Sequence, residues 1–234
     1  MRSILSDLFA VAERFNFQGN VIDVREFGSG NINHTFLVTL DSTEARHFVL
    51  QRVNTKVFRR PELVMRNMRV ATEHILRRLS LSSPVAGLRW EVPRVLLTEN
   101  GRDHWLGPDG SFWRAVSFIE GSQSFSVLEN TDHAREVGYA VGMFHTLLSD
   151  LEPDRLADTL EGFHVTPLYL RHYDKVLAEY GSEKSPEVNF CLQFVSGRRV
   201  WSHVLEDARA AGKLSARPIH GDPKVSNIMM DTAT

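Results

Sequence analysis

The sequence predicts an α+β protein in two parts, with an antiparallel sheet in the first part and helices in the second. Two observations predict this order. Short runs of β-branched and aromatic residues, separated by turn residues, dominate the first half. Beyond Gly121, apolar residues recur mostly at helical spacing. We therefore expect one domain over residues 1–121 and a second over residues 122–234, which meet near Glu120 and Gly121.

The first half begins with an amphipathic segment and continues with three β-like runs. The charged residue Asp7 interrupts the apolar start, which therefore predicts a helix and not a signal peptide. Turn residues at 28–30 and 41–43 separate the runs and indicate an antiparallel meander. The three predicted strands are Val21–Phe27, Thr35–Leu40 and His47–Val53.

A helix and two further strands complete the predicted first half. Pro61 is predicted to be the first residue of a helix, a position at which the missing N–H of proline costs no hydrogen bond. After it, Val64, Met68 and Ala71 begin a stripe at helical spacing. Strands are predicted at Trp90–Thr98 and Ser111–Ile119, around a turn at residues 107–110.

Three helices are predicted in the second half. Apolar residues between Ala134 and Leu151 recur at intervals of three and four residues, and the segment Asn130–Asp132 offers an N-cap before them. A second helix is predicted at about Pro167–Glu179 and a third at about Glu187–Ala211.

Composition excludes some classes of protein. The 234 residues are 42% hydrophobic and 24% charged, which is ordinary for a globular protein. The net charge of −2 and the absence of a long basic run argue against nucleic acid as a partner. Apolar stretches fall short of the ~20 residues needed to cross a membrane. The single cysteine, Cys191, fits the reducing cytoplasm and is expected to be a small buried residue.

The segment His220–Asp231 carries the strongest chemical signal. It has the pattern His-x-Asp-x-x-x-x-Asn, with Asp222 and Asn227 at the positions where kinases place a catalytic Asp and a magnesium-binding Asn. The carboxylate meets the acceptor hydroxyl, while the amide oxygen holds the metal on the phosphates. Lys224 would lie near the transferred phosphate and offset its developing charge. The alternative is an Asp-Pro turn that only closes a loop.

A glycine segment between the first two strands is the candidate phosphate cradle. Gly28, Ser29, Gly30 and Asn31 could present backbone N–H groups to an anion, because glycine lets the chain approach closely. A plain hairpin is the alternative and, for this segment alone, the more common case.

The third strand should supply a cation to the phosphates, where kinases use lysine. Here the choice is between Gln51, favoured by position in the motif, and Arg52, favoured by charge, and only one can face the cleft. Glu73, next to the apolar stripe of the helix, and Glu62 are the candidates for a helix carboxylate that pairs with this cation. Backbone groups at Ile119 and Glu120, where the two halves meet, could form hydrogen bonds to the edge of adenine.

Together these segments resemble the aminoglycoside phosphotransferase-like branch of the protein-kinase fold. Within it, the chain is most similar to the N-acetylhexosamine kinase type, which phosphorylates the anomeric hydroxyl of an N-acetylated sugar. The resemblance implies two lobes, ATP and Mg²⁺ as nucleotide and metal, and a sugar as substrate. The segments that carry it are Phe27–Phe36, Phe48–Asn54, Val57–Phe58, Val64–Met68, Trp113–Gly121, Gly162–Pro167 and His220–Asn227.

The resemblance also implies residues beyond the last one, Thr234. A second acidic metal ligand and several sugar-binding residues of the family would follow it, so the helical lobe is expected to be incomplete and this chain by itself a poor enzyme. Asp231 lies too close to Asn227 to replace that ligand. Two alternatives stay open: a kinase for an amino alcohol or aminoglycoside, and a nucleotide-binding protein without catalysis.

Overall fold

The computed structural model describes residues 2–28, 30, 32–42, 45–81, 88–183 and 185–232, with side chains from Asp7 onward. These residues form two compact units. One unit comprises residues 1–159 together with 218–234, and the other comprises residues 160–217. The boundary predicted at residue 121 separates two lobes of a kinase-like fold and not these two compact units. It remains a prediction.

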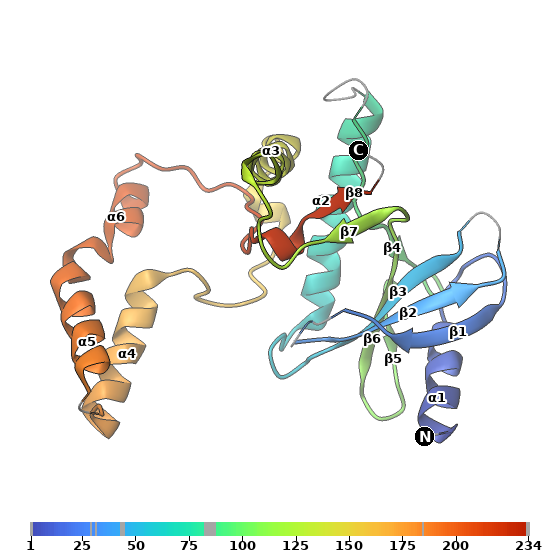
Figure 1. The fold of residues 1–234 in the computed structure, drawn as a ribbon, viewed down its shortest axis with the longest axis horizontal. Helices are drawn as coiled ribbons and strands as arrows, with labels where there is room; N and C mark the ends of the chain where they lie inside the picture. Colours follow the sequence, from blue (N-terminus) through green and yellow to red (C-terminus); the bar gives the residue numbers. More distant parts are fainter. Residues whose placement is uncertain are drawn as a thin grey trace. The chain divides into compact units, whose positions relative to one another are not determined.

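The first unit is built on a six-stranded antiparallel sheet with the strand order β1-β2-β3-β6-β4 and with β5 paired to β6 (Figure 1). The first three strands pair in sequence order, which confirms the predicted meander. The strands are β1 (Val21–Glu26), β2 (His34–Leu40), β3 (His47–Val53), β4 (Val95–Leu96), β5 (Trp105–Leu106) and β6 (Phe112–Ser117).

One strand prediction was too long. Of the range Trp90–Thr98, only Val95–Leu96 pairs as a strand. Pro93 has no N–H for a ladder hydrogen bond, and the backbone N–H of Arg94 donates to the Ser117 hydroxyl at 2.9 Å. The short strand β5 was not predicted, although its hairpin with β6 closes at the expected turn of residues 107–110.

Helices pack on opposite faces of this sheet (Figure 1). Helix α1 (Arg2–Ala12) places Leu8 and Val11 in a core with Phe48 and Leu50 of β3. Helix α2 (Pro61–Leu81) places the fully buried Met65 against Val53 of β3 and Phe112 of β6. Because strand side chains alternate, Leu50 and Arg52 belong to the α1 face, whereas Gln51 and Val53 belong to the α2 face.

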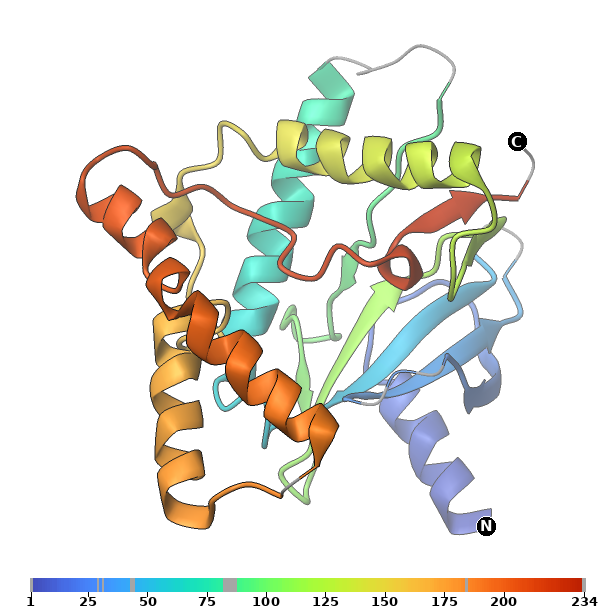
Figure 2. The same cartoon turned by 60° about the vertical axis from the view of Figure 1, so that its left-hand side comes forward.

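Helix α3 (Thr131–Leu147) packs against α2, and Figure 2 shows the two helices crossing. The N-cap predicted within Asn130–Asp132 is confirmed and is Asn130, whose Oδ1 accepts a hydrogen bond from the N–H of His133 at 2.8 Å. Buried Ile75 of α2 meets Leu147, Leu148 and Leu151 at the end of α3. The α2 side of the sheet is therefore the side on which α3 lies.

The described residues of the second unit form the helices α4 (Thr166–Tyr180), α5 (Pro186–Arg198) and α6 (Val204–Ala210). The prediction of a single helix over Glu187–Ala211 was wrong. A 3-10 turn at Arg199–Trp201 separates α5 from α6. The Ser202 hydroxyl donates to the carbonyl of Arg199 at 2.8 Å, a local bond that competes with continuation of the helix.

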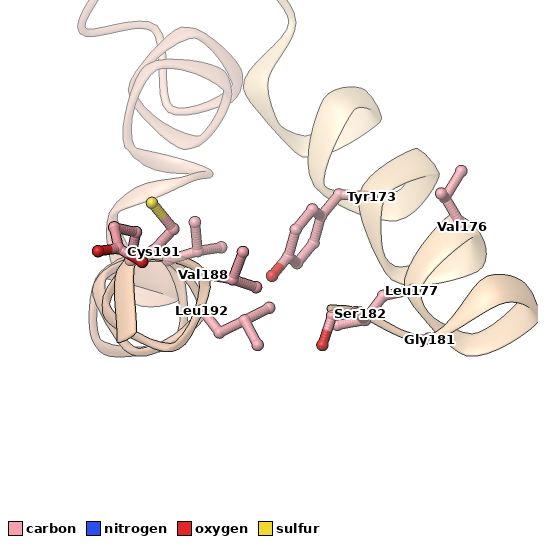
Figure 3. Close-up of a pocket in the computed structure, with 10 residues that line it drawn as sticks. Tyr173, Val176, Leu177, Gly181, Ser182, Val188, Cys191 and Leu192 are labelled. Carbon is pink, nitrogen blue, oxygen red and sulfur yellow. The ribbon is translucent and has the colours of Figure 1, made fainter. Parts of the chain in front are cut away.

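An apolar groove lies between α4 and α5 in this second unit (Figure 3). Tyr173 and Leu177 line it from α4, and Val188, Cys191 and Leu192 line it from α5. Cys191 is exposed, so the expectation that it is buried was wrong. Among the residues that the structure describes, no helix is both long enough and apolar enough to span a membrane.

Candidate active site

The segment that carries the Asp-Asn motif ends in a strand that pairs with the residues after β6. Strand β8 (Met229–Asp231) pairs antiparallel with β7 (Ser122–Ser124), with Ser122 opposite Asp231 and Ser124 opposite Met229 (Figure 1). The pairing extends by one bond, since the N–H of Thr232 donates to the carbonyl of Gly121 at 2.8 Å. The loop before β8 is thereby held beside the junction at Glu120 and Gly121.

Within the loop, the structure brings three predicted residues together. The amide Nδ2 of Asn227 donates to the Asp222 carboxylate oxygen Oδ2 and to the Asp222 carbonyl, both at 2.9 Å. The ammonium of Lys224 lies 3.1 Å from the same Oδ2. A 3-10 turn at Val225–Asn227 makes this possible, because it returns Asn227 to the start of the loop.

These neighbours keep Asp222 ionised. Hydrogen bonds from Lys224 and then Asn227 lower the pKa of Asp222 below its ordinary value, with a smaller contribution from the nearby charges. The carboxylate is more than half exposed. It is therefore a charged hydrogen-bond acceptor that is open to solvent and held in orientation by Lys224 and Asn227.

Asn227 still has an unused acceptor. Its nitrogen is bound to Asp222, which leaves the carbonyl Oδ1 available, and carboxamide oxygens are donors of the kind that Mg²⁺ accepts. Asn227 thus fits the role of one metal ligand. Within the described residues, no group of three or more His, Cys, Asp or Glu side chains could hold a metal ion.

His220 anchors the loop to α3. Its backbone N–H donates to Nε2 of His145 at 3.2 Å, and its ring Nδ1 accepts from the N–H of Asp222 at 3.3 Å. The ring packs edge-on against Phe144, with centroids 5.2 Å apart. Burial lowers the pKa of His220, so its ring is neutral at pH 7 and can act as this acceptor. His145 was not predicted here, since its contact depends on how α3 packs.

The glycine segment is described only in part. Gly28 has a φ of 78°, which favours glycine, and a side chain there would meet nothing within 4 Å. The predicted residues Ser29 and Asn31 lie outside the described residues. Just after them, Asn33 Oδ1 accepts from the backbone N–H of Asn54 at 3.0 Å, which ties the segment to the end of β3.

The two candidates for the strand cation point to opposite faces of the sheet. Arg52, on the α1 face, forms an ion pair of 3.0 Å with Asp109 and lies 6.0 Å from the centre of the Trp113 ring. Gln51, on the α2 face, donates to the Thr35 hydroxyl at 3.0 Å and accepts from Arg114 at 2.8 Å. Which of the two serves the phosphates stays a prediction.

Glu73, the predicted carboxylate partner of the strand cation, pairs within its own helix. Its Oε1 lies 3.2 Å from Nε of Arg69, one turn earlier in α2, and its side chain is largely exposed. In the described residues it makes no ion pair with Arg52 and no hydrogen bond to Gln51. Its role toward a nucleotide stays a prediction.

At the junction, the backbone carbonyls already have partners. The hydroxyl of Ser122 donates to the Ile119 carbonyl at 2.6 Å, and Arg89 Nη2 donates to the Glu120 carbonyl at 2.8 Å. The Glu120 carboxylate lies 2.6 Å from His47 Nδ1.

Arg89 is a residue that the sequence did not single out. Besides its bond to Glu120, it forms an ion pair of 3.2 Å with Asp231 at the end of β8. It thus connects the junction with the strand that follows Asn227. These contacts join residues distant in sequence, so no local pattern could have predicted them.

A sheet with a helix on each face, followed by a loop that pairs an Asp with an Asn, defines a kinase-like α+β protein. The model of the phosphotransferase enzyme family (APH) matches residues 23–234, and the chain belongs to this family.

Solved structures of similar proteins are distant in sequence. An aminoglycoside phosphotransferase from Alicyclobacillus acidocaldarius is 16% identical; the match covers 79% of this chain and 47% of that one, with a TM-score of 0.47. Amicoumacin kinase hAmiN is 15% identical; the match covers 77% of this chain and 54% of that one, with a TM-score of 0.47. The spectinomycin phosphotransferase APH(9)-Ia is 10% identical; the match covers 98% of this chain and 64% of that one, with a TM-score of 0.49. This chain thus spans about half to two thirds of their lengths.

Proposed function

We propose that this chain carries the nucleotide site and catalytic loop of an ATP-dependent small-molecule kinase that transfers the γ-phosphoryl group to a sugar hydroxyl. The N-acetylhexosamines are the proposed acceptors. One observation carries the proposal: an ionised, solvent-accessible Asp222 is held between Lys224 and Asn227. Membership of the phosphotransferase family supports it.

In this proposal, Asp222 orients the acceptor hydroxyl and takes its proton. The hydroxyl oxygen then forms a bond to the γ-phosphorus, while the bond from that phosphorus to the β–γ bridging oxygen breaks and ADP leaves. Lys224 stands 3.1 Å from Asp222 and can offset negative charge on the transferred group. Mg²⁺, held in part by Asn227 Oδ1, would neutralise the phosphates. The protein contributes mainly positioning and electrostatics.

The nucleotide would lie against the glycine segment and the junction. Backbone N–H groups near Gly28 and Gly30 would face phosphate oxygens, and backbone groups near Ile119 and Glu120 would face the adenine edge. Arg89 already donates to the Glu120 carbonyl and also pairs with Asp231, so it holds the junction and the end of β8 together and leaves the second contact to the other backbone groups there.

The charges around the loop favour a neutral acceptor over a cationic one. Each carboxylate described near the loop has a cationic or imidazole neighbour. Asp222 lies beside Lys224, Asp231 beside Arg89, and Glu120 beside His47. A site for an aminoglycoside or amino alcohol would need surplus negative charge to attract the amine. A cytoplasmic location is proposed with this substrate class, since ATP and a reduced cysteine belong there.

The acceptor is tested with a protein extended past Thr234, so that the expected second metal ligand is included. ADP release is measured with N-acetylglucosamine, N-acetylgalactosamine, simple hexoses, choline and kanamycin, each with Asp222→Asn as the background control. We expect the highest kcat/KM with an N-acetylhexosamine. A preference for a cationic acceptor would replace the sugar assignment. ATP binding without turnover on any acceptor would favour a non-catalytic nucleotide-binding protein.

A further inference from the structure

Arg114 of β6 stands beside the position where the kinase pattern expects a cation. In the pairing of β3 with β6, Gln51 lies directly opposite Arg114, and Arg52 lies opposite Trp113. Residues opposite each other in an antiparallel pair share a face of the sheet. Arg114 therefore belongs to the α2 face with Gln51, and Arg52 belongs to the α1 face.

The contacts of Arg114 are with neutral groups. Its Nε donates to Gln51 Oε1 at 2.8 Å, and its Nη1 lies 3.6 Å from the sulfur of Met68 in α2. Among the described residues, no carboxylate pairs with it. Burial lowers the pKa of Arg114 to about 10, and no charged neighbour offsets this effect. The guanidinium is still protonated at pH 7, so it is a half-buried cation with no counterion among the residues that the structure describes.

Such an arrangement is costly unless an anion completes it. A buried charge without a partner destabilises a fold, because the lost hydration is not replaced. Met68 occupies the place on α2 from which a carboxylate could have neutralised the guanidinium. With Gln51 bound to Nε and the sulfur a weak acceptor, the guanidinium keeps N–H groups for a strong anionic acceptor.

The face that carries Arg114 is also the side of the catalytic loop. Helix α2, which contacts Arg114 through Met68, packs on α3 through Ile75 and Leu147. Helix α3 in turn receives the loop through the bond between His145 and His220. Arg52 is on the other side of the sheet and is neutralised by Asp109.

We propose that Arg114 binds the phosphates of the nucleotide and that Gln51 positions it, so that the cation expected on β3 comes instead from the neighbouring strand. The inference rests on the proposed function, because a nucleoside triphosphate is the anion it requires. A guanidinium suits this role, since its planar N–H groups can engage two phosphate oxygens at once.

The test compares ATP with adenosine by isothermal titration calorimetry of this chain in EDTA, so that metal does not contribute. The ratio of the two dissociation constants reports the phosphate contacts alone. Arg114→Met should reduce the preference for ATP about tenfold or more, the effect of losing a charge-assisted bond. Arg52→Met, which removes a cation from the opposite face of the same strand pair, should change the ratio much less. Thermal melting shows whether each variant folds.

The outcomes separate this inference from the function on which it rests. An unchanged ratio in Arg114→Met, or an equal loss in Arg52→Met, overturns the role of Arg114 and leaves the kinase proposal standing. A parent chain that binds neither ligand overturns the nucleotide site itself, and with it the inference. If Arg114→Met does not fold, Arg114→Gln replaces it; this variant is neutral, keeps a donor for Gln51, and is expected to lose the preference in the same way.

Discussion

The catalytic loop and the α2 face of the sheet each hold part of the proposed site, but they are built in different ways. In the loop, Asp222, Lys224 and Asn227 are close in sequence, and a 3-10 turn brings them together. On the sheet, Thr35, Gln51 and Arg114 come from three strands and meet only through strand register. Local spacing therefore determines the first arrangement, and tertiary pairing determines the second.

The largest effect is expected in the loop. In a protein extended past Thr234, Asp222→Asn keeps the shape of the side chain but removes the charge and the base, so kcat should fall about 10²–10⁴-fold. The KM for ATP should change little, because Asp222 faces the acceptor. Steady-state kinetics measures both. Asp132→Asn, on the exposed first turn of α3, is the matched control, and near-normal turnover in Asp222→Asn would remove Asp222 from its assigned role.

An intermediate effect is expected on the sheet. If Arg114 meets the phosphates, Gln51→Ala should raise the KM for ATP more than Arg52→Ala does, although Gln51 is uncharged. Gln51 holds the guanidinium at 2.8 Å, whereas Arg52 is paired with Asp109 on the opposite face. A hydrogen bond to a charged group contributes about 1.5–3 kcal/mol, which sets the upper limit of the effect. The reverse ranking would assign the phosphates to Arg52.

The sequence predicted most of the fold, and its candidate loop residues Asp222, Lys224 and Asn227 do lie together, although their roles stay predictions. The meander β1–β3, helix α2 and the N-cap of α3 follow from residue patterns within single segments. The role of Arg114 could not be predicted, because it depends on which residue of β6 lies opposite Gln51. Arg89 and His145 were missed for the same reason, since their partners lie far away in sequence. The break at Arg199–Trp201 was missed because apolar spacing continues across it.

A smaller effect concerns the charge of the loop. The hydrogen bond from Lys224 is the main cause of the lowered pKa of Asp222, so Lys224→Met should raise that pKa. Activity that needs the ionised carboxylate is lost as the pH falls through this pKa. The acidic limb of the kcat/KM profile should therefore move to higher pH. Lys56→Met, on the chain between β3 and α2, should leave the limb in place; an unmoved limb in Lys224→Met would mean that the profile does not report Asp222.

The smallest effect concerns the backbone of the loop. Gly221 has a φ of 82° and open space around it, so Gly221→Ala adds strain without a clash. A left-handed conformation costs other residues about 1–2 kcal/mol, and the free energy of unfolding should fall by that amount. Gly142→Ala, inside α3 and also in open space, should raise the free energy of unfolding by about 0.5–1 kcal/mol. Urea denaturation measures this free energy for both variants. An equal change in the two variants would mean that Gly221 does not adopt the left-handed conformation.

The most direct test of the central claim is hydrogen–deuterium exchange of this chain with and without ATP. The account predicts slower exchange in the segment after β1, in β3 and β6, and in the loop of residues 218–228. It predicts no change in the second unit, although that unit contains the apolar groove between α4 and α5. Slower exchange confined to residues 160–217 would contradict the account, because neither Arg114 nor Asp222 belongs to that unit.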